Sequence, residues 1–148
     1  MRFLFDAEKC SACGACAVAC MDQNDIDIAG GQRAYRRVWR EEREGAADYY
    51  SRACLHCADA PCVPACPMGC LYKDEATGLT LADTAACIGC RACLRACPID
   101  APTFRPTGAE HPRVRMEKCD GCHVRAEAGM DPACVRACPT GALTWEKQ

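Results

Sequence analysis

Seventeen cysteines, sixteen of them in four tight groups, constrain this 148-residue chain more than any other feature. The first and third groups have the spacing C-x2-C-x2-C-x3-C, the second C-x2-C-x4-C-x3-C, and the fourth C-x2-C-x11-C-x3-C. The groups are Cys10, Cys13, Cys16 and Cys20; Cys54, Cys57, Cys62 and Cys66; Cys87, Cys90, Cys93 and Cys97; and Cys119, Cys122, Cys134 and Cys138. Cys70 stands outside them. Four groups of four thiols are what four cubane iron–sulfur clusters need, because each cubane takes four thiolates.

A disulfide scaffold and zinc are the two competing explanations for so many cysteines. Disulfide-rich secreted domains spread an even number of cysteines between loops. Here the number is odd, the groups are tight, and Met1–Lys9 carries no export signal. Structural zinc prefers two separated cysteine pairs around one ion, which only the fourth group matches. We therefore predict iron–sulfur clusters, with zinc at the fourth group as the alternative.

The composition also requires something besides apolar packing to hold the chain together. Leu, Ile, Val and Phe supply only 20 of the 148 residues, below the level of roughly 20% at which disorder is suspected. Disorder also calls for a strong net charge, whereas the formal charge here is −2. Metal–sulfur bonds are therefore expected to replace much of the apolar core. The near-neutral net charge also argues against a nucleic-acid partner, which favours a basic surface. No run approaches the roughly 20 apolar residues of a membrane helix.

The spacing within each group suggests how the motifs combine. Three closely spaced cysteines can reach three iron atoms of one cubane, and the fourth begins a segment that leads away. In two-cluster bacterial ferredoxins that fourth cysteine ligates the other cluster. A proline follows the fourth cysteine in three groups, as Pro67, Pro98 and Pro139, whereas Met21 follows it in the first. We therefore expect the motifs to interlock in pairs.

The four motifs, taken in order, resemble the iron–sulfur (polyferredoxin) subunits of the dimethyl sulfoxide reductase family, and the resemblance runs from Asp6 to Leu143. It rests on the sequences D-A-E-K-C-S-A-C-G-A-C-A-V-A-C-M-D-Q-N, C-L-H-C-A-D-A-P-C-V-P-A-C-P, C-I-G-C-R-A-C-L-R-A-C-P-I-D-A-P-T-F, and K-C-D-G-C with A-C-V-R-A-C-P-T-G-A-L. Such subunits carry four 4Fe–4S clusters. The resemblance therefore implies an α+β fold of two interlocked bacterial-ferredoxin-like units, with little regular secondary structure. Met21 and Cys70 depart from the repeated pattern.

The same resemblance implies a pairing that spacing alone does not give: the first motif with the fourth, and the second with the third. The implied ligand sets are Cys10, Cys13, Cys16 and Cys138; Cys119, Cys122, Cys134 and Cys20; Cys54, Cys57, Cys62 and Cys97; and Cys87, Cys90, Cys93 and Cys66. Residues 1–45 would form the first half of an outer unit, with a hairpin. Residues 46–106 would form an inserted inner unit, and residues 107–148 the second half of the outer unit.

Local sequence patterns predict short elements around the motifs. Strands are expected at Arg2–Asp6, Leu79–Asp83, Arg113–Glu117 and Leu143–Glu146. Helices are expected to begin near a fourth cysteine, as in Ala17–Asn24 and Leu94–Cys97. The β-forming run Ala34–Glu42, with glycines on both sides, predicts a hairpin. The prolines of Asp100–Pro112 predict an irregular connector.

The function that the resemblance implies is electron transfer without substrate chemistry, because clusters saturated by four cysteines leave no iron open to substrate. No catalytic residue is predicted. The expected partners are a molybdenum- or tungsten-pterin catalytic subunit and a second redox protein, with a flavin subunit as one candidate. A tungsten aldehyde oxidoreductase is the favoured catalytic partner, because this chain is close to a minimal four-cluster unit. Many members dock on a membrane anchor through a longer tail, and the few residues after the last motif here make a membrane quinol partner less expected.

Several alternatives remain open at the level of sequence. The catalytic partner is alternatively a formate dehydrogenase, a hydrogenase or a dimethyl sulfoxide reductase-like complex. A free soluble polyferredoxin and head-to-tail stacking into a filament are further alternatives. Because no export signal is seen before the first motif, a cytoplasmic location is the simplest expectation, and export of the folded chain with a partner that carries a twin-arginine signal is the alternative.

Other residues with suggestive chemistry are expected to have ordinary roles. Cys70 is predicted to be a small buried side chain, with a redox sensor or substitute ligand as the alternative. His56 and His123 are predicted to be structural or surface residues rather than ligands. Packing within the hairpin or over a cluster is expected, ahead of a partner-facing patch, for Tyr35, Trp39, Tyr49 and Tyr50. Exposed positions are expected, ahead of a role in raising cluster potentials, for Arg91, Arg95, Lys118, Arg125 and Arg136.

Overall fold

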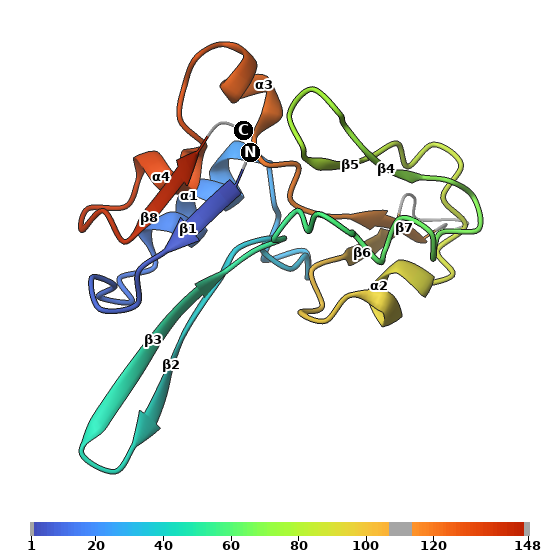
Figure 1. Ribbon diagram of the computed structural model, residues 1–148. Coiled ribbons are helices and arrows are strands. Elements are labelled where there is room, and N and C mark those ends of the chain that lie inside the picture. Colours follow the sequence, from blue (N-terminus) through green and yellow to red (C-terminus); the bar gives the residue numbers. More distant parts are fainter. Residues whose placement is uncertain (1, 107–113, 147–148) are drawn as a thin grey trace.

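The computed structural model describes residues 2–106 and 114–146 of the chain. In this part of the chain, four two-stranded antiparallel ladders and four short helices surround the cysteine motifs (Figure 1). In chain order the elements are β1 (Arg2–Phe5), α1 (Ala15–Gln23), β2 (Arg37–Arg43), β3 (Ala46–Arg52), β4 (Leu71–Lys73), β5 (Thr80–Ala82), α2 (Ala92–Ala96), β6 (Thr103–Pro106), β7 (Val114–Glu117), α3 (His123–Glu127), α4 (Ala133–Arg136) and β8 (Leu143–Glu146). The fold is therefore α+β with little regular secondary structure, as predicted.

The two ends of the sequence form one half of the molecule. Strand β1 pairs antiparallel with β8, with Phe3 opposite Trp145, and α1 packs against α4. The buried residues Cys16, Cys134 and Leu143 form the centre of this half. The first and fourth motifs, which are far apart in the sequence, therefore lie side by side (Figure 1).

The middle of the sequence forms the other half, built on the ladders β4–β5 and β6–β7. Its buried centre is Leu71, Cys93 and Met116, with Phe104 packed against it. Phe104 lies opposite Met116 in the β6–β7 ladder, so this ladder joins the third motif to the segment that leads into the fourth.

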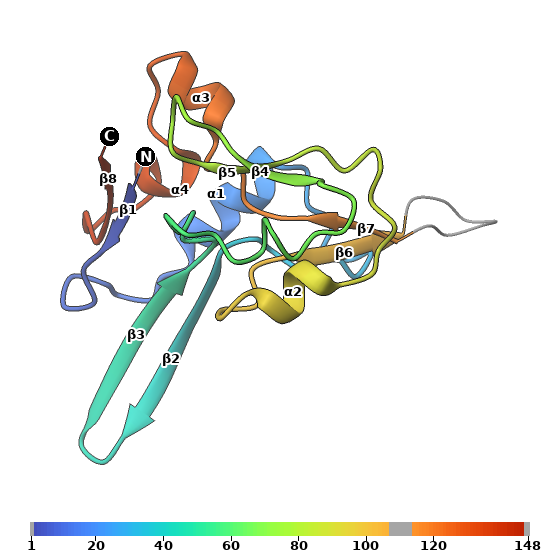
Figure 2. The same cartoon turned by 45° about the vertical axis from the view of Figure 1, so that its right-hand side comes forward.

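A long hairpin, β2–β3, projects from the body of the molecule (Figures 1 and 2). Trp39 stacks on Tyr50 across the two strands, with 5.1 Å between ring centroids. The Arg52 guanidinium lies 5.4 Å from the centroid of the Trp39 ring, a cation–π distance. Packing within the hairpin is thereby confirmed for Trp39 and Tyr50, and the hairpin extends beyond the predicted run to Arg52.

The predicted strands are confirmed as β1, β5, β7 and β8, each at or within the expected range. Helices α1 and α2 begin earlier than predicted, one residue before the third cysteine of their motifs. The reason lies at the preceding residues, Gly14 and Arg91, whose φ values of 79° and 61° turn the backbone ahead of each helix. The second motif forms turns instead of a helix, in keeping with Pro64, which lacks the N–H that a helix interior needs.

The prediction of an irregular connector over Asp100–Pro112 is wrong for Thr103–Pro106, which is strand β6. Proline is tolerated here because β6 has a partner on one side only and Pro106 is its last residue. Residues 107–112 of that connector lie outside the described residues.

The predicted boundaries between the outer and inner units, at residues 45/46 and 106/107, each fall between two strands that pair with each other. The first lies in the turn between β2 and β3, and the second lies at the end of β6, whose partner β7 follows the boundary. The two ladders therefore tie the inserted segment to the outer one on both sides. The division into units stays a prediction. No helix in residues 2–106 or 114–146 has the length and apolar character to cross a bilayer.

Candidate iron–sulfur centres

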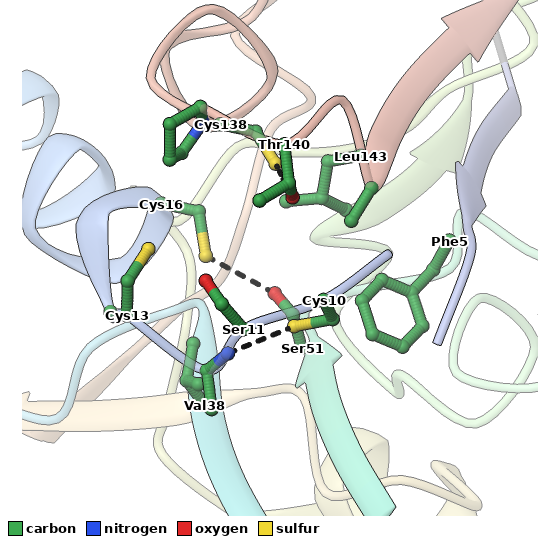
Figure 3. A pocket seen from close by; sticks show the side chains of 14 residues that line it. Phe5, Cys10, Ser11, Cys13, Cys16, Val38, Ser51, Cys138, Thr140 and Leu143 are labelled. Carbon is green, nitrogen blue, oxygen red and sulfur yellow. Dashed lines mark hydrogen bonds between the residues drawn. The ribbon is translucent and has the colours of Figure 1, made fainter. Parts of the chain in front are cut away.

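The first cavity gathers four thiols from the two ends of the sequence (Figure 3). It is a pocket with about 300 Å³ of space free of protein atoms, including space open to solvent, and Phe5, Val38 and Leu143 are among its apolar walls. Three of its cysteines come from the turn before α1 and from α1 itself, and the fourth comes from the loop before β8. We call Cys10, Cys13, Cys16 and Cys138 the first-motif set. The pairing of β1 with β8 brings this set together.

Two further cavities lie in the other half of the molecule. One, of about 310 Å³, is lined by the second-motif set, which is Cys54, Cys57, Cys62 and Cys97. The other, of about 300 Å³, is lined by the third-motif set, which is Cys87, Cys90, Cys93 and Cys66. Cys70 is a fifth thiol in the wall of this last cavity. Each of these sets again combines three cysteines of one motif with one cysteine of another.

The remaining four cysteines influence one another electrostatically. We call Cys119, Cys122, Cys134 and Cys20 the fourth-motif set. Burial raises the pKa of Cys20 to about 11, and the neighbouring Cys134 adds to the rise. Burial and then Cys20 raise the pKa of Cys119, and burial with Cys134 raises that of Cys122. The packing of α1 on α4 brings Cys20 close to Cys134.

The structure thus gathers three of the four implied sets around one cavity each, and in the fourth-motif set Cys20 affects the pKa of Cys119 and is itself affected by Cys134 and Cys122. In the described residues, no three His, Cys, Asp or Glu side chains converge closely enough to hold a single metal ion. In three of the sets the four sulfurs instead line one cavity that is partly open to solvent. Four thiols around one cavity match the ligand demand of a cubane, and thiolates are the ligands that iron–sulfur clusters take. That each of these sulfurs binds iron remains a prediction.

Hydrogen-bond donors point at the sulfurs, as a thiolate-bound cluster requires. At five cysteines the donor is a backbone N–H, with N···S distances of 3.3–3.4 Å. These five are Cys10, Cys66, Cys97, Cys87 and Cys119. The Ser51 hydroxyl lies 3.3 Å from the Sγ of Cys16 (Figure 3). The same hydroxyl accepts a hydrogen bond of 3.0 Å from Arg36. When Cys16 is a thiolate its sulfur has no proton to give, so the Ser51 hydroxyl is then the donor to Cys16.

The cysteine pKa values show that the fold favours thiols at most buried positions. Burial raises the pKa of Cys16, Cys62 and Cys93, the last to about 11. At Cys66 and Cys138 burial acts in the same direction, but hydrogen bonds from the N–H groups that follow lower the pKa overall. A metal that binds these sulfurs must therefore displace protons, so cluster binding and folding are coupled.

Family comparisons identify the cofactor. The family described as "4Fe-4S dicluster domain" matches residues 45–148, and the one described as "4Fe-4S binding domain" matches residues 7–22. The sequence is 38% identical over 154 residues to a chain of the anaerobic dimethyl sulfoxide reductase of Haemophilus influenzae, covering 95% of this chain and 71% of that one. It belongs to the dimethyl sulfoxide reductase iron–sulfur subunit family. It therefore binds 4Fe–4S clusters.

Two other relatives of this iron–sulfur subunit have different named activities. "Thiosulfate reductase electron transfer subunit PhsB" of Salmonella typhi is 38% identical over 146 residues, with 95% of this chain and 72% of the relative covered. A subunit of the tetrathionate reductase of Salmonella typhimurium is 35% identical over 143 residues, with 94% of this chain and 54% of the relative covered.

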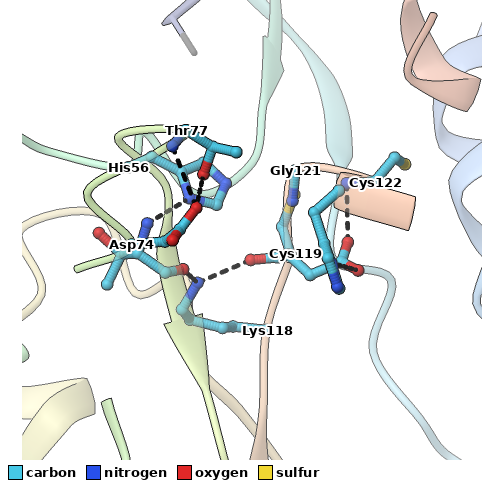
Figure 4. Close-up of polar contacts among 10 residues, drawn as sticks. His56, Asp74, Thr77, Lys118, Cys119, Gly121 and Cys122 are labelled. Atoms are coloured by element: carbon cyan, nitrogen blue, oxygen red, sulfur yellow. Dashed lines mark hydrogen bonds and ion pairs between the residues drawn. The ribbon is translucent and has the colours of Figure 1, made fainter. Parts of the chain in front are cut away.

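The prediction of an exposed position is wrong for Lys118. Its exposed fraction is 6%. The ammonium group donates hydrogen bonds to the carbonyl oxygens of Thr80 and Cys119 (Figure 4). It also lies 3.8 Å from the Sγ of Cys54. The cation therefore lies between the second-motif and fourth-motif sets. The sequence signal was its place directly before Cys119, but nothing in the sequence shows its burial.

The remaining candidates take structural roles. His56 is buried, and its Nδ1 accepts a hydrogen bond of 3.1 Å from the Thr80 N–H. Burial, Lys118 and Lys73 lower the pKa of His56 to about 3, so the ring is neutral. His123 pairs with Asp120 at 3.0 Å. Both histidines therefore have structural contacts, as predicted.

Three of the predicted arginines also have defined contacts. The Arg91 guanidinium lies 5.6 Å from the centroid of the Phe104 ring. Arg95 donates a hydrogen bond of 3.1 Å to the Cys90 carbonyl oxygen, and Arg125 donates one of 2.9 Å to the carbonyl oxygen of Asp131. The hydrogen bonds of Arg95 and Arg125 are exposed to solvent. Sequence reasoning missed Arg36 and Ser51, because no motif marks a polar pair at the base of a hairpin.

Proposed function

We propose that this chain holds four 4Fe–4S clusters in two interlocked ferredoxin-like units and relays electrons between a pterin-containing catalytic subunit and a second redox partner. The first-, fourth-, second- and third-motif sets would each hold one cluster. The observation that carries the proposal is that every set combines three cysteines of one motif with the fourth cysteine of its paired motif. This exchange is the arrangement known from two-cluster ferredoxins.

Contacts between the sets support one order of electron transfer: first-motif, fourth-motif, second-motif and third-motif. Cys16 and Cys134 belong to one buried cluster, Cys54 lies near enough to Cys119 to raise its pKa, and Cys62 packs against a buried cluster that includes Cys93. Each set therefore lies next to the following one. We propose that an electron entering at one end passes through the sets in this order.

The two ends of this path reach the surface. Cys13 of the first-motif set and Cys90 of the third-motif set are exposed. Ile88, beside the third-motif set, is exposed as well. An exposed sulfur at each end suits a relay with one protein partner at each end.

When bound, the clusters supply one-electron redox chemistry, and the protein supplies their ligands and surroundings. Backbone N–H groups and the Ser51 hydroxyl donate to the sulfurs, which stabilises the more negative, reduced form. The apolar walls around the first-motif set limit contact with water. With four thiolates for each cluster, no iron is left for a substrate, so we propose no catalytic step on this chain.

A molybdenum-pterin reductase of oxidised sulfur compounds is the catalytic partner that the named relatives favour. The tungsten aldehyde oxidoreductase expected from sequence is the alternative, and a flavin subunit is a candidate second partner. Gentle anaerobic purification of the tagged chain, followed by metal, flavin and peptide analysis, tests this directly. We expect a large molybdenum-containing chain in stoichiometric amounts. Tungsten would select the alternative, and recovery of this chain alone would favour a free polyferredoxin.

A reconstitution experiment tests the relay itself. The loaded chain is reduced, mixed anaerobically with the co-purified catalytic subunit and its oxidised substrate, and followed by the visible absorbance of the clusters. Reoxidation that requires both substrate and catalytic subunit is the expected result. Turnover of substrate by this chain alone would overturn the proposal. Electron microscopy of the complex tests filament formation, and fractionation tests the proposed cytoplasmic location.

A further inference from the structure

Cys70 is a fifth thiol at a site that needs four. It lines the cavity of the third-motif set, beside Cys66 and Cys87. Its exposed fraction is 3%, so its thiol faces the interior rather than solvent. A spare cysteine that only fills space in an apolar core would not lie beside predicted cluster ligands. Here the cavity that holds the four predicted ligands also holds the fifth sulfur.

The contacts of Cys70 tie it to one of those four ligands in particular. Its backbone N–H donates a hydrogen bond of 3.3 Å to the Sγ of Cys66. The Cys70 side chain lines the same cavity wall as Cys66, Cys87 and the other predicted ligands. Cys70 therefore has both its backbone N–H and its side chain at the site of the predicted cluster.

The second-motif cavity provides an internal comparison. There Ala101 follows Cys97 by four residues, as Cys70 follows Cys66. The Ala101 N–H also donates to its cysteine sulfur at 3.3 Å, and Ala101 also lines its cavity. The loop after the fourth cysteine therefore has the same hydrogen bond at both sites, and the two sites differ in whether this position carries a thiol.

We propose that Cys70 is a reserve ligand, able to take the place of Cys66 on the cluster held by the third-motif set. This inference rests on the proposed function, which assigns a cluster to that set. The exchange needs no oxidant or reductant. The Cys70 thiol gives its proton to the Cys66 thiolate as the iron–sulfur bond to Cys66 breaks and the bond to Cys70 forms. Charge is conserved, and damage to Cys66 leaves the electron path intact.

Four variants test the proposal: Cys66→Ala, Cys66→Ala/Cys70→Ala, Cys97→Ala and Cys97→Ala/Ala101→Cys. Each is purified anaerobically as the full chain. Iron and acid-labile sulfide per chain are measured by native mass spectrometry, and the cluster potentials by an EPR-monitored redox titration. Cys97→Ala is the matched control, because the equivalent ligand is removed where position 101 offers no sulfur. The fourth variant adds a reserve sulfur at that site.

We expect Cys66→Ala to keep the iron and sulfide content of the unaltered chain, with the potential of one cluster shifted. The double variant Cys66→Ala/Cys70→Ala and the single variant Cys97→Ala should each lose iron from one site. Cys97→Ala/Ala101→Cys should regain it. Equal iron loss in Cys66→Ala and Cys66→Ala/Cys70→Ala would overturn the inference, as would failure of Ala101→Cys to restore iron. A failure of the proposed function is distinguishable, because the unaltered chain would then itself lack four clusters.

Discussion

The ammonium nitrogen of Lys118 lies 3.8 Å from the Sγ of Cys54. Lys118 directly precedes Cys119, a member of the fourth-motif set, whereas Cys54 belongs to the second-motif set. One buried cation therefore lies where electrons are predicted to pass between the fourth-motif set and the second-motif set. Cations near a cluster favour its reduced form, because reduction adds negative charge.

Replacing this cation tests its effect on cluster potential. Lys118→Met should make the midpoint potential of at least one cluster more negative, because the reduced form loses a nearby positive charge. The measurement is an EPR-monitored redox titration of the loaded chain. Lys9→Met is a matched control, since Lys9 directly precedes Cys10 but has a side chain that is 61% exposed and pairs with Asp6. Equal potentials in Lys118→Met and the unaltered chain would contradict the prediction.

Lys118→Met should also lower the stability of the loaded chain. The carbonyl oxygens of Thr80 and Cys119 lose their ammonium donor, and a buried acceptor left unpaired costs about 1–3 kcal/mol. Removal of the buried charge offsets part of this cost. We expect a net loss of about 1–3 kcal/mol in anaerobic denaturant unfolding. A variant as stable as the unaltered chain would show that these hydrogen bonds contribute little.

Ser51→Ala should shift the potential of the cluster at the first-motif set to a more negative value. The variant removes the hydroxyl that lies 3.3 Å from the Sγ of Cys16, and it leaves the Arg36 guanidinium, 4% exposed, without that acceptor. A loss of about 1–3 kcal/mol of stability should accompany the shift. Thr140→Ala is the control, because its hydroxyl lies farther from its cysteine, 3.7 Å from the Sγ of Cys138, at an exposed position. Equal effects in the two variants would argue against a specific role for Ser51.

Gly89→Ala should disturb the turn between Cys87 and Cys90. The φ of Gly89 is +69°, where a side chain costs about 1–2 kcal/mol, and an added Cβ would overlap the backbone carbonyl oxygen of Val114. Gly45→Ala, at the tip of the β2–β3 hairpin, has a φ of +74° and nothing within 4 Å of the added Cβ. We expect Gly89→Ala to lower the denaturation midpoint more than Gly45→Ala. A larger loss in Gly45→Ala than in Gly89→Ala would show that the loop around Gly89 moves easily to accommodate the added Cβ.

Removing the clusters should unfold much of the chain. Few large side chains are fully buried in the described residues; Leu79 and Met116 are among them. Without iron–sulfur bonds, the four cysteine sets have little apolar contact to replace them. Chelation after anaerobic oxidation should therefore expand the chain on size exclusion and weaken its far-ultraviolet circular dichroism. Reconstitution with iron and sulfide should restore both. A compact cluster-free chain would contradict this expectation.

The cysteine spacing predicted the cofactor because the ligands of a cluster recur at fixed intervals in the sequence, whereas the fold class came from the family resemblance. The strands Arg2–Phe5 and Leu143–Glu146 were also predictable, since β-forming residues flank the motifs at both ends. The pairing of Cys138 with the first motif came from the family resemblance and not from spacing. It depends on the β1–β8 ladder, which joins distant parts of the chain.

Other features depend on tertiary contacts that no local pattern records. Lys118 is a hydrophilic residue next to a motif, and only the surrounding carbonyl groups make its burial favourable. Strand β6 was missed because Pro102 and Pro106 suggested a connector. The pairing with β7 involves only Thr103–Pro106, which leaves Pro102 outside the strand and Pro106 at its end. Cys70 was predicted as a buried side chain, and it is buried. Its position beside Cys66 and Cys87 became visible only in the folded cavity.

Native mass spectrometry of the anaerobically purified protein tests the central claim most directly. If each of the four cysteine sets holds one cubane, the mass will exceed that of the bare polypeptide by about sixteen iron and about sixteen sulfide ions. Replacing the fourth cysteine of any motif except Cys66 will then remove iron from one site. A folded chain that carries a single zinc ion, or one that lacks acid-labile sulfide, would contradict the claim.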